Sequence, residues 1–437
     1  MRAPEQRSLA LRLLGGLVVW ISTCYCGPVS RKGQRRGREG TGLYPELAVL
    51  GISEGSSPAL ASTVGRLSAL LPSYEVTRGE LAQRGVPLDI KVVHRIAGQL
   101  GAEILTTRAR DLQRYRAGEL PRGRELAGKR VGAAVDGGRT RVRTVIRKQK
   151  GRGKGKKQRR RFRVEWREPK VLIIFEMDRR GRMVAKSRPW IDGTFAGPDE
   201  CMELLAMHLH RLGAAEAKVV AFLADGAPWI WERLAWVEQR VGLRARQTVR
   251  VLDWCHALHH VSLGLEALGL ETQERQRLYR QCKKWLRAGQ VGKVLAELVT
   301  RGPDDAAGTP LGTELAYLEK HQMAGHLDYD QFRRRGLPVG SGAIESAIRR
   351  VVNLRLKGAG LLWLEENAEA ALVLRAAVLT DRWQETLDHV RVSMASDRRL
   401  DWHWQSPDMP AELKAGKRIA PPVPQTPAAQ GAQPAAA

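Results

Sequence analysis

Three acidic residues stand where they could catalyse a reaction at a phosphodiester. Asp136 and Asp225 each end an apolar run, and each is followed directly by glycine. Glu345 lies in the first turn of a predicted helix that Gly340-Ser341-Gly342 opens. Carboxylates are the preferred ligands of hard divalent cations, and two such ions about 4 Å apart can activate an attacking oxygen and stabilise the leaving one. The three acids therefore predict a metal-dependent site that cuts DNA, provided that the fold brings them together.

Each of these acids also has an ordinary explanation. Asp136-Gly137 and Asp225-Gly226 are both typical of plain turns. Glu345 alone is explained as a carboxylate at a helix start, where the helix dipole favours an anion. The functional interpretation depends on the joint pattern, and loss of any one acid should then abolish the chemistry.

A second pair of chemical residues follows a later apolar run. Asp253 ends the predicted strand 248–253, and His256 lies in the helix that follows it. Two roles remain open for His256: it contacts the scissile strand, or it is a core histidine that caps its own helix.

The charge of the chain indicates a polyanionic partner. Among 437 residues there are 73 Lys and Arg against 46 Asp and Glu, which gives a formal net charge of +27. Such an excess favours nucleic acid first and an anionic membrane surface second. No apolar window reaches the ~20 residues of a membrane span, so we expect DNA as partner and no membrane.

The positive charge is concentrated next to Asp136. Eleven of the seventeen residues from 147 to 163 are Lys or Arg, and none is acidic. We expect a flexible cationic loop that contacts the DNA backbone, the alternative being a solvated face. A second basic group follows Glu345, and a solvated helix face is its alternative. The residues predicted to contact DNA are Arg139, Arg147, Lys148, Lys150, Arg152, Lys154, Lys156, Lys157, Arg349, Arg350, Arg355 and Lys357.

Helical patterns precede the acids, over residues 43–115. Ser57 before Pro58 and Asp89 before an apolar-periodic segment are typical N-caps. Thr77–Glu80 has a capping-box pattern that predicts a short helix over 81–83. A helix, a glycine-containing turn and a basic helix indicate a helix-turn-helix-like unit, with a plain helical hairpin as the alternative.

Strand patterns position the acids. The runs 130–136 and 171–177, with a third strand over 183–191, predict an antiparallel meander with a turn at 178–181. Helices then alternate with the strands 218–225 and 248–253, which predicts an α/β layer with parallel strands. Ligands gather at the carboxyl ends of such strands, where Asp136 and Asp225 stand.

The remaining segments complete the expected organisation. Residues 17–24 suit a strand, although arginines around the apolar stretch 13–21 also resemble a signal peptide. Five scattered cysteines indicate a reducing cytoplasm, and Cys24-Tyr25-Cys26 has only a weak case as a zinc knuckle. We expect an N-terminal strand and basic linker (1–42), a helical DNA-binding region (43–125), a catalytic core (126–260), a helical insertion (261–335), C-terminal core helices (336–400) and a disordered Pro- and Ala-rich tail (401–437).

In combination, these motifs resemble a known family. Asp136-Gly-Gly-Arg139, Ala224-Asp225-Gly-Ala-Pro-Trp229, Asp253-Trp-Cys-His256 and Gly340-Ser-Gly-Ala-Ile-Glu345-Ser resemble the DDE transposases of bacterial insertion sequences. The resemblance is to the ISKra type, related to the Mutator-like superfamily, and it covers roughly residues 40–395. It implies a ribonuclease-H-like catalytic domain with a helical insertion.

The resemblance also implies an activity and its site. Asp136, Asp225 and Glu345 match the metal-binding triad, and Asp253 with His256 matches the Asp-x-x-His motif of such enzymes. The implied cofactors are two Mg²⁺ or Mn²⁺ ions, and the implied partners are the terminal inverted repeats and target DNA, bound by a homodimer or larger assembly at the bacterial nucleoid. Rival interpretations are a nuclease or resolvase of the same fold, and a non-catalytic DNA-binding derivative.

Overall fold

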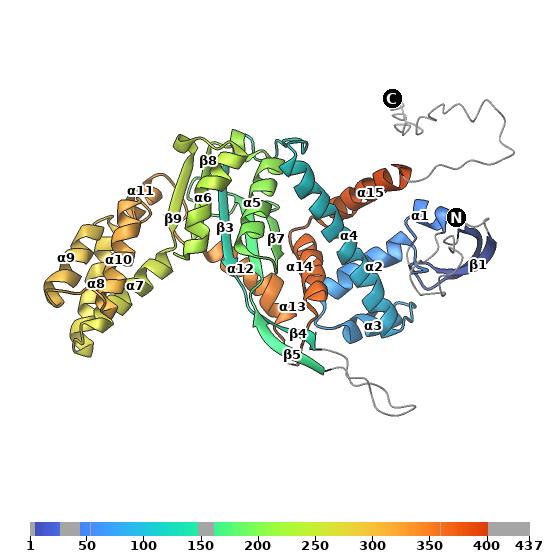
Figure 1. Cartoon of the computed structure of the whole chain (residues 1–437), viewed down its shortest axis with the longest axis horizontal. Helices are drawn as coiled ribbons and strands as arrows, with labels where there is room; N and C mark the ends of the chain where they lie inside the picture. Colours follow the sequence, from blue (N-terminus) through green and yellow to red (C-terminus); the bar gives the residue numbers. More distant parts are fainter. Residues whose placement is uncertain (1–4, 27–43, 53, 147–160, 359, 401–437) are drawn as a thin grey trace, which may run out of the picture. The chain divides into compact units, whose positions relative to one another are not determined.

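A five-stranded mixed sheet holds the candidate catalytic acids. The computed structural model describes residues 5–26, 44–52, 54–146, 161–358 and 360–400. The strand order is β7-β6-β3-β8-β9 (Figure 1). β6 is antiparallel to β3 and β7, whereas β8 is parallel to both β3 and β9. The strands are β3 (Arg130–Gly137), β6 (Lys170–Glu176), β7 (Trp190–Thr194), β8 (Val219–Ala224) and β9 (Thr248–Leu252). The predicted α/β class is therefore confirmed.

The inner strands are buried almost along their whole length. Every residue of β8 is buried, as are the five central residues of β3 and of β6. Strands covered on both faces read as continuous apolar runs, which is why the sequence located them. α5 (Pro198–Leu212) contacts β6 and β7, α12 (Gly342–Ile348) contacts β3 and β6, and α14 (Glu365–Leu379) contacts β7.

The third strand begins later than the sequence predicted. The turn at Asp178 is present, because its Oδ1 accepts hydrogen bonds from the N–H groups of Arg180 and Arg182. Met183 then forms only an isolated bridge to Met177. Lys186 has a positive φ of 62°, so the chain turns again before β7 starts at Trp190.

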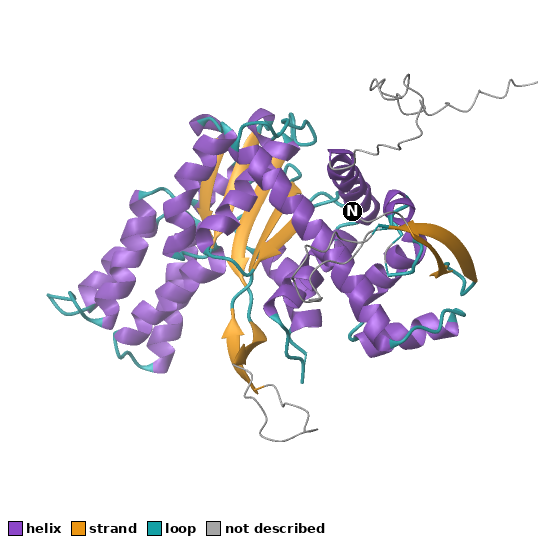
Figure 2. Cartoon of the chain, turned by 45° about the vertical axis from the view of Figure 1, so that its right-hand side comes forward, coloured by secondary structure: helices purple, strands orange, loops and turns teal. Residues whose placement is uncertain are grey.

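A second, separate pair of strands was not predicted. β4 (Thr140–Ile146) pairs with β5 (Arg161–Arg167) in an antiparallel ribbon, drawn in Figure 2 apart from the five-stranded sheet. The last three residues of the predicted cationic loop thus belong to a strand, and residues 147–160 lie outside the described residues. Alternating arginines concealed the β-branched residues of β4, which favour a strand.

The N-terminal strand is also one of a pair. β1 (Glu5–Arg12) is antiparallel to β2 (Val18–Tyr25). Gly15 and Gly16 join them with φ values of 94° and 88°, which only glycine adopts without strain. Gly-Gly is typical of such hairpin turns, but only the second of the two strands was predicted from the sequence. The basic linker at 30–42 lies outside the described residues.

The helices before the sheet share a small core. α2 (Pro58–Leu70), α3 (Tyr74–Gln83) and α4 (Ile90–Arg116) follow α1 (Pro45–Val49). Ser57 and Asp89 cap α2 and α4 as predicted. α3 begins seven residues earlier than the capping-box pattern predicted, because Ser73 accepts from the N–H of Val76. The buried core residues are Leu60, Val64, Leu81, Val86, Leu88, Val93 and Ile96.

Helices dominate the rest of the described chain. Helices are present between residues 261 and 335, as predicted, and so is the helix that carries Glu345. The helix predicted from there to Met394 is interrupted at residues 357–358, 360–364 and 380–382. These elements are α6 (Pro228–Val241), α7 (Trp254–Ala267), α8 (Thr272–Arg287), α9 (Val291–Arg301), α10 (Pro310–Met323), α11 (Tyr329–Arg334), a π-helical turn (Arg349–Asn353), α13 (Leu354–Leu356) and α15 (Trp383–Leu400).

Residues 1–393 belong to one compact unit, and a second unit begins at Met394. The segment boundaries within the first unit stay predictions, and the predicted tail at 401–437 lies outside the described residues. No helix in the described ranges is long and apolar enough to cross a membrane.

Candidate active site

Three aspartates form a row across neighbouring parallel strands. β3 and β8 pair with Ala134 opposite Leu223, and β8 and β9 pair with Ala224 opposite Leu252. Continuing these registers places Asp136 beside Asp225 and Asp225 beside Asp253. Residues in register on adjacent strands point to the same face and lie about 5 Å apart. The predicted meeting of Asp136 and Asp225 thus follows from the sheet itself.

The electrostatics agree with this proximity. Burial raises the pKa of Asp136 from 3.8 to about 6, and the negative charges of Asp225 and Glu168 add to this effect. A hydrogen bond from the Gly137 N–H to Asp136 Oδ1, at 2.6 Å, and the nearby His256 act in the opposite direction. Two carboxylates at one strand end therefore repel each other in the absence of a cation.

Asp253 connects three segments around this row. Its Oδ1 accepts from the N–H of His256 at 2.8 Å, which caps α7, and faces His256 Nδ1 at 3.1 Å. Its Oδ2 accepts from the N–H of Ser341 at 2.6 Å. The Asp253 side chain is only 1% exposed. Asp253 thus orients both His256 and the start of α12, rather than facing solvent itself.

His256 is partly exposed and faces the acids. Its pKa is raised by the hydrogen bond to Asp253 and further by the charges of Asp225 and Asp136. Its side chain is 44% exposed, so it is not a core histidine, and Asp253 rather than His256 caps the helix. A protonated imidazole here places a positive charge near the two carboxylates.

Glu345 lies in the first turn of α12, as predicted. Its Oε1 accepts from Ser341 Oγ at 2.6 Å, and the residue is exposed. Ser341 thus links Glu345 to Asp253 in one hydrogen-bonded chain. A Cβ on Gly342 would meet nothing within 4 Å, and one on Gly340 only Asp253 Oδ2 at 3.8 Å. The described residues around Gly340 and Gly342 therefore leave room for a side chain at both positions.

The residues fit a cation as a pair rather than as a closed triad. Asp136 and Asp225 lie close together and repel each other, and a bound divalent cation would relieve this repulsion. Across the ranges that the structure describes, no group of three or more His, Cys, Asp or Glu is arranged to hold a metal ion.

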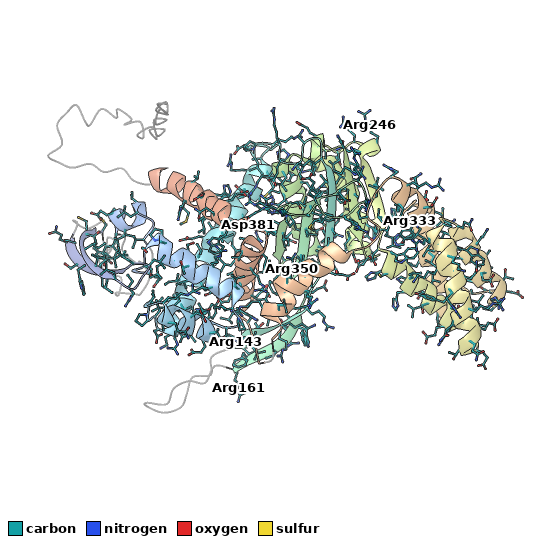
Figure 3. All side chains as sticks on the ribbon, turned by 180° about the vertical axis from the view of Figure 1, so that it is seen from behind. Arg143, Arg161, Arg246, Arg333, Arg350 and Asp381 are labelled. Carbon is teal, nitrogen blue, oxygen red and sulfur yellow. The ribbon has the colours of Figure 1, made fainter. Side chains whose placement is uncertain are left out.

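The basic residues predicted to contact DNA fall into two groups. Arg139, Arg349 and Lys357 are exposed, and Arg350 is half-buried (Figure 3). Arg355 is 2% exposed: its Nε donates to Ser68 O at 3.3 Å, and its guanidinium lies over the rings of Tyr74 and Trp363. The structure therefore places Arg355 in the interior between segments rather than on a DNA path. The predicted residues from Arg147 to Lys157 lie outside the described residues.

Tyr317 is a residue at this site that sequence reasoning missed. It belongs to α10 in the helical insertion, yet its hydroxyl reaches the turn after Asp225. Burial raises the pKa of Tyr317 well above its usual range, and the negative charges of Asp225 and Asp253 add to this effect. His260 stacks on its ring at 3.5 Å and pairs with Glu314 through Nδ1. The sequence did not indicate this role, because Tyr317 is simply one residue of a predicted helical segment. Only the fold brings α10 close to the end of β8.

Gly226→Ala should disrupt the Asp225 turn. A Cβ at Gly226 would lie 1.9 Å from Tyr317 Oη, and the glycine has a φ of +25°. We expect the variant to lose about 1–3 kcal/mol of unfolding free energy through overpacking and strain. Urea denaturation measures this loss. Gly342→Ala is the matched control, because its new methyl group meets open space. Equal stability of the two variants would contradict the placement of Tyr317.

His256→Asn should destabilise the protein in a pH-dependent manner. The folded pKa of His256 lies above its ordinary value of 6.5. Its charged interactions therefore stabilise the fold fully below pH 6.5, and this stabilisation is lost as pH rises through the folded pKa. Urea denaturation should show a loss on the order of 1 kcal/mol at pH 5.5 and a smaller one at pH 9. A loss that is the same at both pH values would contradict the ion pair with Asp253.

No protein-family model and no curated protein matches this sequence.

Proposed function

We propose that this protein is a DDE-type DNA transposase, which cleaves DNA at the ends of its element and joins them to target DNA. The observation that carries the proposal is the pair of carboxylates, Asp136 and Asp225, in one register at the carboxyl ends of adjacent parallel strands. The raised pKa of Asp136 beside Asp225 supports a site built for a cation. The motifs that resemble the ISKra-type transposases supply the reaction class.

The sheet supports a ribonuclease-H-like core. Numbered by their position in the sheet domain, its strands have the order 3-2-1-4-5, with only the second strand antiparallel to the others. In such a core the acids stand on the first and fourth strands and on a later helix. Asp136 on β3, Asp225 after β8 and Glu345 on α12 occupy these places.

The chain's own residues would do three things in this reaction. Asp136 and Asp225 would hold divalent cations, Mg²⁺ or Mn²⁺, which when bound activate the attacking oxygen and stabilise the leaving oxygen. Asp253 would fix His256 and the start of α12, so that Glu345 is presented from a defined helix end. His256, whose pKa is raised by its hydrogen bond to Asp253, would lie near the phosphate of the scissile strand. The broken phosphodiester supplies the energy of the new one, and no Gly-x-x-x-x-Gly-Lys-Ser/Thr loop occurs in the sequence.

The DNA partners follow from charge and organisation. The net charge of +27 favours a polyanion, and the exposed Arg139, Arg349 and Lys357 lie on segments adjoining the acids. The α3–turn–α4 segment would bind the terminal repeats of the element. Joining two ends to one target would require a homodimer or a larger assembly, acting at the bacterial nucleoid.

A strand-transfer assay separates this proposal from its rivals. The full-length protein is incubated with labelled DNA carrying the repeats that flank its coding region, a supercoiled target and Mg²⁺ or Mn²⁺. We expect labelled ends covalently joined to the target. Cleavage without joined product would indicate a nuclease or resolvase, and binding without cleavage would indicate a non-catalytic derivative.

A further inference from the structure

The β4–β5 ribbon presents one face on which arginines alternate with exposed apolar residues. In an antiparallel pair, residues directly opposite each other point to the same side. Arg141 pairs with Trp166, Arg143 with Val164 and Val145 with Phe162. We call these six residues the ribbon face.

The apolar side chains of the ribbon face are exposed. Val145, Phe162, Val164 and Trp166 have 45–51% of their surface accessible. Four adjoining exposed apolar residues on one face indicate a binding surface, whereas single ones do not. The side chains of the opposite face anchor the ribbon at its base: Val142 is 1% exposed, and Thr140 Oγ1 donates to Leu356 O at 2.7 Å. The anchored ribbon therefore leaves the ribbon face open.

Guanidinium groups lie over the aromatic rings of this face. The guanidinium carbon of Arg143 is 5.6 Å from the ring centroid of Phe162. Those of Arg139 and Arg141 are 5.3 and 5.9 Å from the ring centroid of Trp166. Figure 3 labels Arg143 on the ribbon. The one acid of the two strands, Glu165, is opposite Val142 and therefore on the other face. These arginines form no ion pair with the residues that the structure describes. Aromatic rings beside such cations suit a ligand that is both flat and anionic.

We propose that the ribbon face binds unpaired nucleotides of a DNA strand, with bases stacked on Trp166 and Phe162 and phosphates near Arg139, Arg141 and Arg143. Stacking platforms beside a cationic track are the way in which proteins hold single strands. The two rings are four residues apart on β5, roughly 13 Å, so each holds a separate base. Because Arg139 follows Asp136 by three residues, the strand would lie beside the candidate acids. This inference adds a single-strand binding surface to the proposed function, and its placement beside the acids rests on that function.

Fluorescence anisotropy with labelled DNA tests the proposal on the full-length protein. The probes are a single-stranded oligothymidine and a duplex of the same length, at fixed salt and without divalent cations. Trp166→Leu should raise the dissociation constant for the single strand about 5–100-fold, because one stacking ring is lost. Its effect on the duplex should stay within about 2-fold, because phosphate contacts dominate there. Trp166→Phe should restore most of the single-strand affinity.

The matched control is Trp20→Leu, which removes another tryptophan, 72% exposed, from strand β2. It should leave both dissociation constants unchanged. Unchanged single-strand affinity in Trp166→Leu, or an equal loss for single strand and duplex, would overturn the proposal. The binding experiment does not depend on catalysis. Single-strand binding through the ribbon face without any joined product would contradict the transposase proposal alone. If the wild type forms joined product and Trp166→Leu binds the single strand normally, the ribbon proposal alone is contradicted.

Discussion

Asp136→Asn should yield a protein that is more stable than the wild type and unable to cleave DNA. The pKa of Asp136 is about 6 in the fold, against 3.8 without its surroundings. The destabilisation of the fold by Asp136 is therefore absent below pH 3.8. It grows between pH 3.8 and 6, where the carboxyl ionises in the unfolded chain before it does in the fold, and it is fully present at neutral pH. A full shift corresponds to about 3 kcal/mol, and partial exposure reduces the expected gain to about 1–3 kcal/mol. We expect cleavage to fall by at least about 10²–10³-fold.

Urea denaturation at pH 7 without divalent cations measures the gain in stability. Adding Mg²⁺ or Mn²⁺ should then stabilise the wild type but not Asp136→Asn, because the cation relieves the repulsion between Asp136 and Asp225. Asp178→Asn is the control with the opposite sign: the N–H groups of Arg182 and Arg180 lower the pKa of Asp178, so its loss should destabilise the protein at neutral pH. A destabilised Asp136→Asn would refute the electrostatic account of the site.

Arg108→Met should cause the largest loss of stability, about 3–5 kcal/mol, because it leaves a buried carboxylate without its main partner. Arg108 on α4 donates to Asp192 on β7 at 2.9 Å and to Glu369 on α14 at 2.7 Å. The Arg108 and Asp192 side chains are 15% and 8% exposed. Arg108 and His208 hold the pKa of Asp192 well below its usual range, against the effect of burial. The stability from this pair is therefore present at neutral pH and lost in acid.

The midpoint and slope of urea denaturation at pH 7 measure this loss. Arg78→Met is the matched control, because Arg78 forms an exposed ion pair with Glu75 and should change stability by less than about 1 kcal/mol. Similar losses in both variants would show that the Arg108 cluster contributes no more than a surface pair. A large loss would show that α4 depends on the sheet and α14, and that the helices before the sheet do not fold independently of it.

The sequence predicted the parts of the fold in which local pattern and burial agree. The strands around Asp136 and Asp225 are buried on both faces, so their apolar runs marked both the strands and their ends. The caps at Ser57 and Asp89 were predictable because an N-cap needs one side chain and two or three neighbours. The pairing of Asp136 with Asp225 was expected from the rule that ligands gather at strand ends, and the register gives it a physical basis.

The features that escaped prediction depend on contacts between distant segments. Arg355 reads as one more cation of a basic helix, and only its packing against Tyr74 and Trp363 makes it an interior residue. Tyr317 lies 92 positions after Asp225 in the sequence. The sequence did not predict the ribbon, because arginines alternate in β4 with the residues that anchor it. Their charge obscured the strand pattern.

If Asp136 and Asp225 together catalyse the joining of DNA ends, loss of either carboxylate should stop the reaction. The amount of joined product formed with Mg²⁺ or Mn²⁺ is measured for the wild type, Asp136→Asn, Asp225→Asn and the neighbouring control Glu168→Gln. We expect joined product from the wild type and Glu168→Gln, and none above background from either aspartate variant, although both still bind the DNA. Joined product at the wild-type level from Asp136→Asn or Asp225→Asn would show that these two carboxylates do not catalyse the reaction.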